Sequence, residues 1–181
     1  MKSRRSHYEM AFEAYLDRRG TAYVAVEDVH HFGAKATGVK AFDYIVYPAG
    51  ARACLVDLKG RKSPLQAADG ECRQKNWVTR SDITGLRSWQ EVFGPEYEAV
   101  FVFAYWLAGG TLDAAAHGEQ GGDLGVFRFA GRPYSFWLAP VAVYAEHAKR
   151  LSARWDTVSV PRDTFRRISR RLEGSWEAAP C

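Results

Sequence analysis

AFDYIVYPAGARACLVDLKG, residues 41–60, contains two apolar runs separated by a segment of Pro, Ala, Gly and Arg. The runs Ala41–Tyr47 and Ala53–Lys59 carry apolar residues on both faces of an extended chain. Strands that are apolar on both faces are typical of a sheet that helices cover on each side. This stretch therefore predicts two buried strands, and the rest of the chain is expected to supply the covering helices.

Each of these strands also carries an acidic residue where strand periodicity predicts burial. Asp43 follows a large apolar residue and precedes a run of them. Asp57 and Lys59 are two residues apart, so their side chains point to the same face of a strand. Burying a carboxylate costs several kcal/mol unless a partner compensates for its charge. A divalent cation such as Mg²⁺ is one such partner, because carboxylate oxygens are its preferred protein ligands.

Further helices and strands are predicted on both sides of this stretch. Ser6 and Glu9 have the spacing of a capping box, and Gly20 is expected to end the helix that they begin. The other expected elements are a strand at Ala22–Val29, a helix capped by Ser81 and stopped at Gly94, a strand at Val100–Leu107, a hairpin of Val126–Phe129 with Tyr134–Leu138, a helix from Pro140, a strand at Thr157–Val160 and a helix near Asp163–Leu172. Trp77, Trp89 and Trp106 are expected in the core, and Gly60–Arg80 is expected to be irregular.

The order of these elements predicts an α/β core with an α+β elaboration after it. A chain of 181 residues is long enough for one well-buried core and short for two, so we expect a single domain, residues 1–181. Within it, the Gly-rich segment 108–125 is expected to be a loop. Residues 126–181 are expected to add a C-terminal hairpin and helices.

The composition indicates a globular cytoplasmic protein. Hydrophobic residues make up 47% of the chain and charged residues 25%, which excludes a disordered chain. The longest apolar run, Ala99–Ala108, is far shorter than the roughly 20 residues that cross a membrane. The basic first residues lead into no apolar run, so no secretory signal is expected. The three cysteines are odd in number and form no CxxC motif, so neither a disulfide framework nor a zinc site is indicated.

The net charge of +4 is concentrated in the C-terminal segment. Residues 149–181 contain eight Lys or Arg and four Asp or Glu, and the rest of the chain therefore sums to zero. A basic segment of this kind is expected where a protein faces a polyanion. A solvated helix surface would have the same composition, and both interpretations stay open on charge alone.

The acidic residues and the lysine occur in an order that resembles the PD-(D/E)XK nuclease superfamily. A helix with a glutamate precedes Asp43, then Asp57-Leu58-Lys59 follows on the next strand, and a helix and a strand come after it. The layout is similar to that of the archaeal Holliday junction resolvases, and the resemblance covers roughly residues 6–107. Phe42 stands where the family name implies proline, and the segment after Gly60 is longer than expected for the family.

The resemblance implies a restriction-endonuclease-like core with a central mixed sheet flanked by helices. It also implies a metal-dependent endonuclease that hydrolyses phosphodiester bonds, with DNA as the expected substrate. Asp43, Asp57 and the carbonyl of Leu58 would bind Mg²⁺, for which Mn²⁺ can substitute. Lys59 would position the attacking water or stabilise the negative charge that develops on phosphorus. Glu9 best matches the glutamate of the first helix and Glu13 is second, although Glu9 is also the expected capping partner of Ser6.

Basic side chains near this site and in the last helix are expected to contact nucleic acid: Arg61, Lys62, Lys75, Arg166 and Arg170. A small nuclease core without a separate specificity domain often depends on dimerisation, so a homodimer is considered, and no membrane partner is expected. Two alternatives stay open. The chain could be a catalytically silent nuclease-fold protein that binds nucleic acid or a protein, or an unrelated α/β enzyme in which Asp57 and Lys59 form a structural ion pair.

Overall fold

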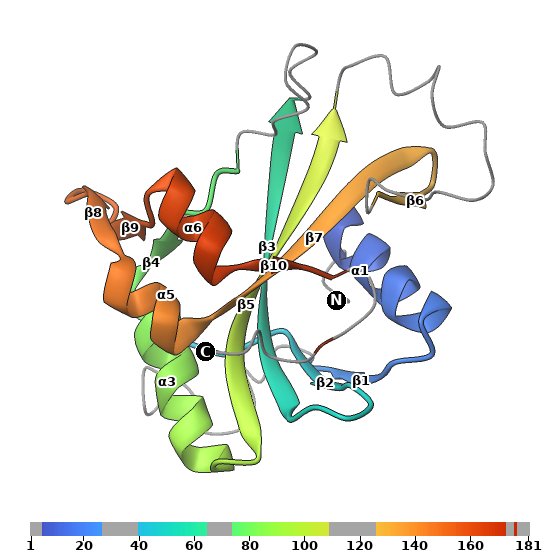
Figure 1. Cartoon of the computed structure of the whole chain (residues 1–181), viewed down its shortest axis with the longest axis horizontal. Helices are drawn as coiled ribbons and strands as arrows, with labels where there is room; N and C mark the ends of the chain where they lie inside the picture. Colours follow the sequence, from blue (N-terminus) through green and yellow to red (C-terminus); the bar gives the residue numbers. More distant parts are fainter. Residues whose placement is uncertain (1–4, 27–39, 65–73, 109–125, 173–175, 177–181) are drawn as a thin grey trace.

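The computed structural model describes residues 5–26, 40–64, 74–108, 126–172 and 176 of the chain. In these residues, a seven-stranded mixed sheet runs in the order β1-β2-β3-β5-β7-β10, with β6 paired to β7 (Figure 1). Its strands are β1 (Ala22–Ala25), β2 (Tyr44–Tyr47), β3 (Ala53–Pro64), β5 (Tyr97–Ala108), β6 (Phe127–Phe129), β7 (Arg132–Pro140) and β10 (Arg170–Arg171). A smaller sheet has the order β4 (Val78–Thr79), β9 (Thr157–Ser159) and β8 (Lys149–Ser152).

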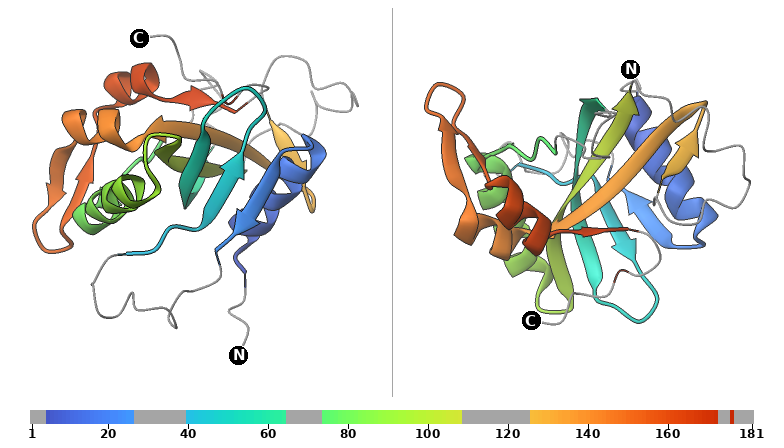
Figure 2. Two further views of the ribbon diagram at one scale, coloured as in Figure 1. Left: turned by 90° about the horizontal axis from the view of Figure 1, so that it is seen from below. Right: turned by 45° about the horizontal axis from the view of Figure 1, so that its top comes forward.

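Helices cover both faces of the main sheet, as the two apolar runs predict. Helix α1 (His7–Arg18) lies on one face, and α3 (Arg80–Phe93), α5 (Val141–His147) and α6 (Arg162–Ile168) lie on the other (Figures 1 and 2). Each face has its own apolar core. One is built around Phe12 of α1, and the other around Leu86, Tyr144 and Phe165. The predicted mixed sheet flanked by helices is confirmed. No helix of the described residues is long and apolar enough to cross a membrane.

Strand β3 begins at Ala53 as expected, but β2 begins at Tyr44 and not at Ala41, so Asp43 directly precedes β2. Strand β2 pairs antiparallel with β3, and β3 pairs parallel with β5 along its whole length. The expectation that Gly60–Arg80 is irregular is wrong at both ends, since β3 continues to Pro64 and Val78–Thr79 form β4. Residues Gly60–Pro64 stay in the sheet because they pair with Ala104–Ala108 of β5. Residues 65–73 lie outside the described residues.

The capping box of the first helix is confirmed. The Ser6 side chain accepts a hydrogen bond from the Glu9 amide at 3.3 Å, and the Ser6 amide donates to Glu9 Oε2 at 2.5 Å. Helix α3 begins two residues earlier than Ser81 implies, because Thr79 is its N-cap. The Thr79 side chain accepts from the Asp82 amide at 3.1 Å, and Asp82 accepts from the Thr79 amide at 2.7 Å.

The last predicted helix is too long. Helix α6 ends at Ile168, where the Ser169 hydroxyl donates a hydrogen bond to the carbonyl of Phe165 at 2.5 Å. The chain then extends as β10, which pairs antiparallel with β7, so Arg170 lies on a strand and not on the helix. The free energy gained by strand pairing and by burying Leu172 in the core outweighs the helical preference of this segment.

The other expected elements are found with small changes in their ends. The predicted hairpin is present as β6 and β7, and α5 starts directly after Pro140. Strand β1 covers the first half of the expected Ala22–Val29, and residues 27–29 lie outside the described residues, as does the Gly-rich segment from 109 to 125. Trp89 and Trp106 are half-buried, but the expectation for Trp77 is wrong, since 39% of its side chain is exposed. The single-domain organisation stays a prediction.

Glycine is needed at position 60 because α1 lies directly over β3 there. A Cβ atom at Gly60 would lie 2.4 Å from Cδ2 and 2.5 Å from Cγ of the Tyr8 ring. We therefore expect Gly60→Ala to lower the free energy of unfolding by about 1–3 kcal/mol in a chemical denaturation experiment, since the ring must move. In a Tyr8→Ala background the same substitution should cost much less. An equal cost in both backgrounds would contradict the steric explanation.

Candidate functional site

Asp43 and Asp57 lie at the point where β2 separates from β3. Tyr44 and Val56 form the last pair of this antiparallel ladder, so the two aspartates are the next residues on the neighbouring strands. The Asp43 amide donates to the carbonyl of Val56 at 2.8 Å. Its carboxylate Oδ2 accepts a hydrogen bond from the Leu58 amide at 2.6 Å. The Asp43 carboxylate is thereby held beside the part of β3 that carries Asp57.

Lys59 joins two buried carboxylates. Its Nζ lies 2.7 Å from Asp57 Oδ1 and 3.2 Å from Asp82 Oδ1. Asp57 is only 4% exposed and Asp82 3% exposed. The second oxygen of Asp57, Oδ2, is buried and has no hydrogen-bond partner among the described residues. This arrangement leaves one buried carboxylate oxygen free to accept a ligand.

Asp82 is a member of the cluster that the sequence analysis missed. It lies in the first turn of α3, where the capping box with Thr79 fixes its carboxylate. Its ion pair with Lys40 brings a second lysine to the cluster. The spacing Thr79-x-x-Asp82 was a visible capping signal, but placing the cap at Ser81 hid it. Nothing in the sequence connects Lys40 with Asp82, because 42 residues separate them.

Lys40 reaches Asp82 because α3 lets the chain approach closely. A Cβ atom at Gly85 would lie 2.9 Å from the carbonyl oxygen of Lys40, so glycine leaves room for this segment. The same carbonyl accepts a hydrogen bond from Trp89 Nε1 at 2.9 Å. Two residues on one face of α3 therefore fix the backbone of Lys40.

Burial and the charges of the cluster shift the pKa values of its carboxyl groups, upward for Asp43 and Asp57 and downward for Asp82. Burial and the charge of Asp57 raise the pKa of Asp43 to about 7, against the opposing effects of the Leu58 amide and Lys59. Burial also raises the pKa of Asp57, although Lys59 opposes it. Burial acts in the same direction on Asp82, but Lys59 and Lys40 outweigh it and lower that pKa to about 2. Burial and like charge therefore disfavour the ionised forms of Asp43 and Asp57, but not that of Asp82.

The two candidate glutamates of α1 have partners just before this helix and in β2. Glu9 holds the capping box, and its charge contributes to the raised pKa of Asp43, so its carboxylate is within electrostatic range of the site. Glu13 pairs with Arg5 at 2.7 Å and accepts a hydrogen bond from the Tyr44 hydroxyl at 3.2 Å. A role for Glu9 in the site stays a prediction.

Three of the basic residues predicted to contact nucleic acid lie on or near β3. The guanidinium of Arg61 lies over the ring of Trp77, 4.0 Å from its centroid, and donates to the Trp77 carbonyl at 2.6 Å. Lys62 is exposed, with its Nζ 5.0 Å from the centroid of the Trp106 ring. Lys75 is also exposed. Arg61 therefore contacts Trp77 directly, and Lys75 lines the same hollow as Trp77.

The other two basic residues lie at the C-terminal end of the described chain. Arg166 is exposed on α6, whereas Arg170 is half-buried on β10 and donates a hydrogen bond to the carbonyl of Trp176. They do not share a helix face, contrary to the expectation. Their contact with nucleic acid stays a prediction.

The donor atoms at this site fit a divalent cation. Asp43 and Asp57 supply hard oxygen ligands on neighbouring strands, and Asp57 Oδ2 is buried without a partner. The described residues contain no group of three or more His, Cys, Asp or Glu side chains placed to hold a metal. Mg²⁺ is commonly held by one or two carboxylates, with waters and substrate phosphate completing its shell, so two carboxylates match that pattern.

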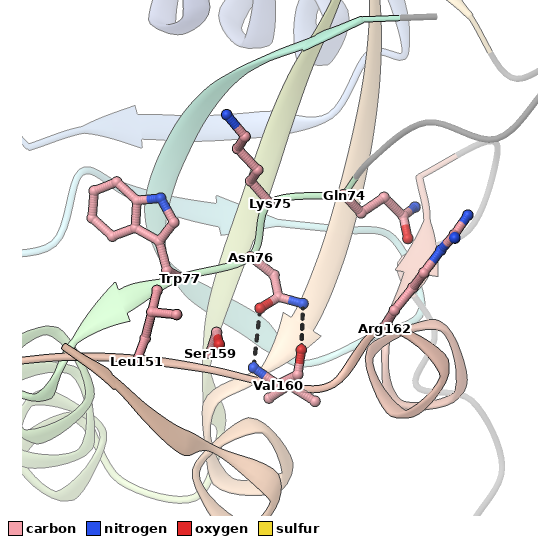
Figure 3. Close-up of a pocket in the computed structure, with 8 residues that line it drawn as sticks. All are labelled: Gln74, Lys75, Asn76, Trp77, Leu151, Ser159, Val160 and Arg162. Atoms are coloured by element: carbon pink, nitrogen blue, oxygen red, sulfur yellow. Dashed lines mark hydrogen bonds between the residues drawn. The ribbon is translucent and has the colours of Figure 1, made fainter. Parts of the chain in front are cut away.

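Two hollows among the described residues lie outside this site, and Trp77 and Leu151 line both of them. Figure 3 shows the residues that line one of these hollows.

The chain is thus a mixed α/β protein in which a half-buried Asp43, a buried Asp57 and Lys59 lie where β2 and β3 separate. No protein-family model and no curated protein matches it. Its structure is similar to that of Hjc from Archaeoglobus fulgidus, a Holliday junction resolvase from an archaeal hyperthermophile. The sequence identity is 13%, the TM-score is 0.47, and the match covers 92% of this chain and 93% of that chain. A likeness at this level carries no conclusion about activity.

Proposed function

We propose that the chain is a metal-dependent phosphodiesterase that cleaves nucleic acid, and more narrowly an endonuclease of the PD-(D/E)XK type. The observation that carries this proposal is the buried Asp57 carboxylate, which keeps one oxygen without a partner beside the carboxylate of Asp43. Two carboxylates that repel each other in a desolvated position are costly to a metal-free protein. Binding a cation removes that cost, so the arrangement suits a metal site better than a purely structural one.

Asp43 and Asp57 would hold Mg²⁺ or Mn²⁺, with the Leu58 carbonyl as a third ligand. When bound, the cation supplies polarisation of the phosphodiester and a lowered pKa of bound water. The Leu58 amide fixes Asp43, and β3 fixes Asp57, so both ligands are positioned before the substrate arrives.

Lys59 would donate a hydrogen bond to the phosphoryl oxygen that becomes more negative during the reaction. The carboxylates of Asp57 and Asp82 hold its ammonium at 2.7 Å and 3.2 Å. These two carboxylate contacts hold the ammonium group in position. Lys40 neutralises part of the charge of Asp82, which leaves Lys59 less tightly held by that residue.

The proposed substrate is DNA. The excess positive charge of the chain and the exposed Lys62 and Lys75 support a polyanionic partner. The choice of DNA over RNA rests on the motif resemblance alone. The proposal includes a cytoplasmic location and a homodimer.

The test is cleavage of supercoiled plasmid DNA by the purified protein. We expect nicking in millimolar Mg²⁺ or Mn²⁺ and none in EDTA. Lys59→Met, prepared in the same way, should be inactive, which excludes a contaminating nuclease. Absence of nicking in either metal, or equal nicking by the Lys59 variant, would contradict the proposal. Folded protein whose melting temperature does not respond to metal would favour the structural ion pair.

A further inference from the structure

Large apolar side chains are exposed around the smaller sheet, outside the carboxylate cluster of the proposed metal site. Trp77 directly precedes β4 and is 39% exposed. Leu151 of β8 is 58% exposed, and Trp155, in the turn between β8 and β9, is 67% exposed. The hairpin of β8 and β9 extends away from the main sheet (Figures 1 and 2). Two exposed tryptophans on one small sheet are unusual, because this side chain gains much from burial.

These side chains surround a hollow of about 470 Å³. It is lined by Trp77, Thr79, Leu151, Ser152, Trp155 and Thr157, so both tryptophans face it together with small hydroxyl groups. A neighbouring hollow of about 220 Å³ shares Trp77 and Leu151 and is also lined by Lys75 and Arg162 (Figure 3). The surface therefore has an aromatic part and an adjoining basic part.

Hydrogen bonds of the residues next to the two tryptophans fix the backbone at both positions. Asn76, next to Trp77, donates to the carbonyl of Val160 at 2.9 Å and accepts from its amide at 3.0 Å (Figure 3). Asp156, next to Trp155, accepts from the Arg80 amide at 3.0 Å and pairs with the Arg80 side chain at 3.2 Å. These contacts join the hairpin to the start of α3 and to the segment before β4. The backbone that carries the two tryptophans is thereby pre-organised.

Cations lie beside both rings. Arg61 lies over Trp77 at 4.0 Å, and Arg154 lies over Trp155 at 5.1 Å from the ring centroid. Residues 149–162 contain four Lys or Arg and one Asp. Aromatic faces surrounded by cations match the two parts of a nucleotide, the flat base and the anionic phosphate.

This surface is close to the proposed active site along the chain. Arg61, which contacts Trp77, is two residues after Lys59 on β3, about 7 Å along the strand and on the same face. A nucleic-acid strand with a phosphate at Lys59 would therefore have its neighbouring nucleotides within reach of Trp77.

We propose that Trp77 and Trp155 stack on unpaired bases of a single-stranded or locally unpaired DNA segment. The proposal rests on the proposed function, since it names the substrate form of that site. In an intact duplex the base faces are covered by their neighbours, so a stacking surface selects unpaired nucleotides. An apolar protein partner would have to bury the surrounding cations, which favours the nucleic acid as occupant.

The test measures binding in EDTA, so its outcome does not depend on cleavage. Fluorescein-labelled 15-nucleotide oligo-dT and a blunt 15-base-pair duplex are titrated with the wild type and with Trp155→Ala, and anisotropy is recorded. We expect the variant to bind oligo-dT about 10-fold more weakly, and the duplex within about 2-fold of wild type. Trp155→Phe should restore most of the affinity. The slope of affinity against salt should stay unchanged, because no phosphate contact is lost.

Tyr47→Ala is the matched control, since Tyr47 is an aromatic side chain, 43% exposed, on β2 of the main sheet. It should bind both probes as wild type does. Equal oligo-dT affinity of wild type and Trp155→Ala would overturn the proposal. So would a wild-type dimer that Trp155→Ala converts to a monomer in sedimentation, because the surface would then be an interface between copies. Stacking without plasmid cleavage would refute the proposed nuclease function alone.

Discussion

Replacing Asp57 with asparagine is expected to lower the rate of plasmid cleavage in Mg²⁺ by at least about 1,000-fold. Asparagine has the same shape, and its carbonyl oxygen can still accept a hydrogen bond from Lys59, now 2.7 Å from the carboxylate. The change removes the charge and the unpaired oxygen that the proposal assigns to the metal. Initial rates of nicking for the two proteins at equal concentration measure the effect.

The same variant should lose most of the stabilisation that metal gives the wild type. A ligand that binds only the folded state raises the free energy of unfolding by RT ln(1 + [L]/Kd), about 2.7 kcal/mol at 100 times Kd. Thermal melts of both proteins, without metal and with Mg²⁺ at about 10 mM, measure how much the metal stabilises each of them. Glu91→Gln, which removes an exposed carboxylate from α3, is the control and should respond to metal as wild type does. An Asp57 variant with unchanged metal response and activity would make Asp57 a structural partner of Lys59.

The central strands could be predicted from sequence because their signals are local. The apolar runs around Asp43 and Asp57 define two buried strands, and the two-residue step to Lys59 sets a common face. The capping box at Ser6 is equally local, and its hydrogen bonds are found. Strand phase and capping chemistry depend on neighbouring residues, so one sequence is sufficient to find them.

The missed features all depend on contacts between distant residues. Lys40 joins the cluster only because Gly85 leaves room for its backbone, and no local pattern indicates that approach. Helix α6 ends early because β10 pairs with β7, a contact that the helical pattern of the last segment hides. Trp77 is exposed because it lies beside the small sheet, whose pairing of β4 with β9 joins segments about 80 residues apart. An expectation of burial that rests on residue type alone takes no account of contacts with residues distant in the sequence.

Asp43→Asn is expected to stabilise the metal-free protein near neutral pH, by on the order of 3 kcal/mol. The folded protein holds the Asp43 proton more tightly than the unfolded chain, since its pKa rises from 3.8 to about 7. A raised carboxyl pKa gives stability that is fully present below about pH 4 and is lost as the pH rises through about 7. Asparagine cannot ionise, and its carbonyl can still accept the hydrogen bond from the Leu58 amide. Thermal melts in EDTA between pH 4 and pH 8 measure the difference.

The two proteins should melt at similar temperatures near pH 4 and diverge as the pH rises. The pH dependence should shrink without vanishing, because burial also raises the pKa of Asp57, which stays in the variant. Asp82 has little effect on this comparison of the two proteins between pH 4 and pH 8. Its pKa is lowered to about 2, so its contribution is lost only when the pH falls below the range tested. In Mg²⁺ the advantage of the variant should disappear, since wild type gains metal binding and the variant lacks a ligand. A variant that is less stable than wild type at every pH in EDTA would mean that the charged Asp43, hydrogen-bonded to Leu58, stabilises the fold, and the strain assigned to the carboxylate pair would be absent.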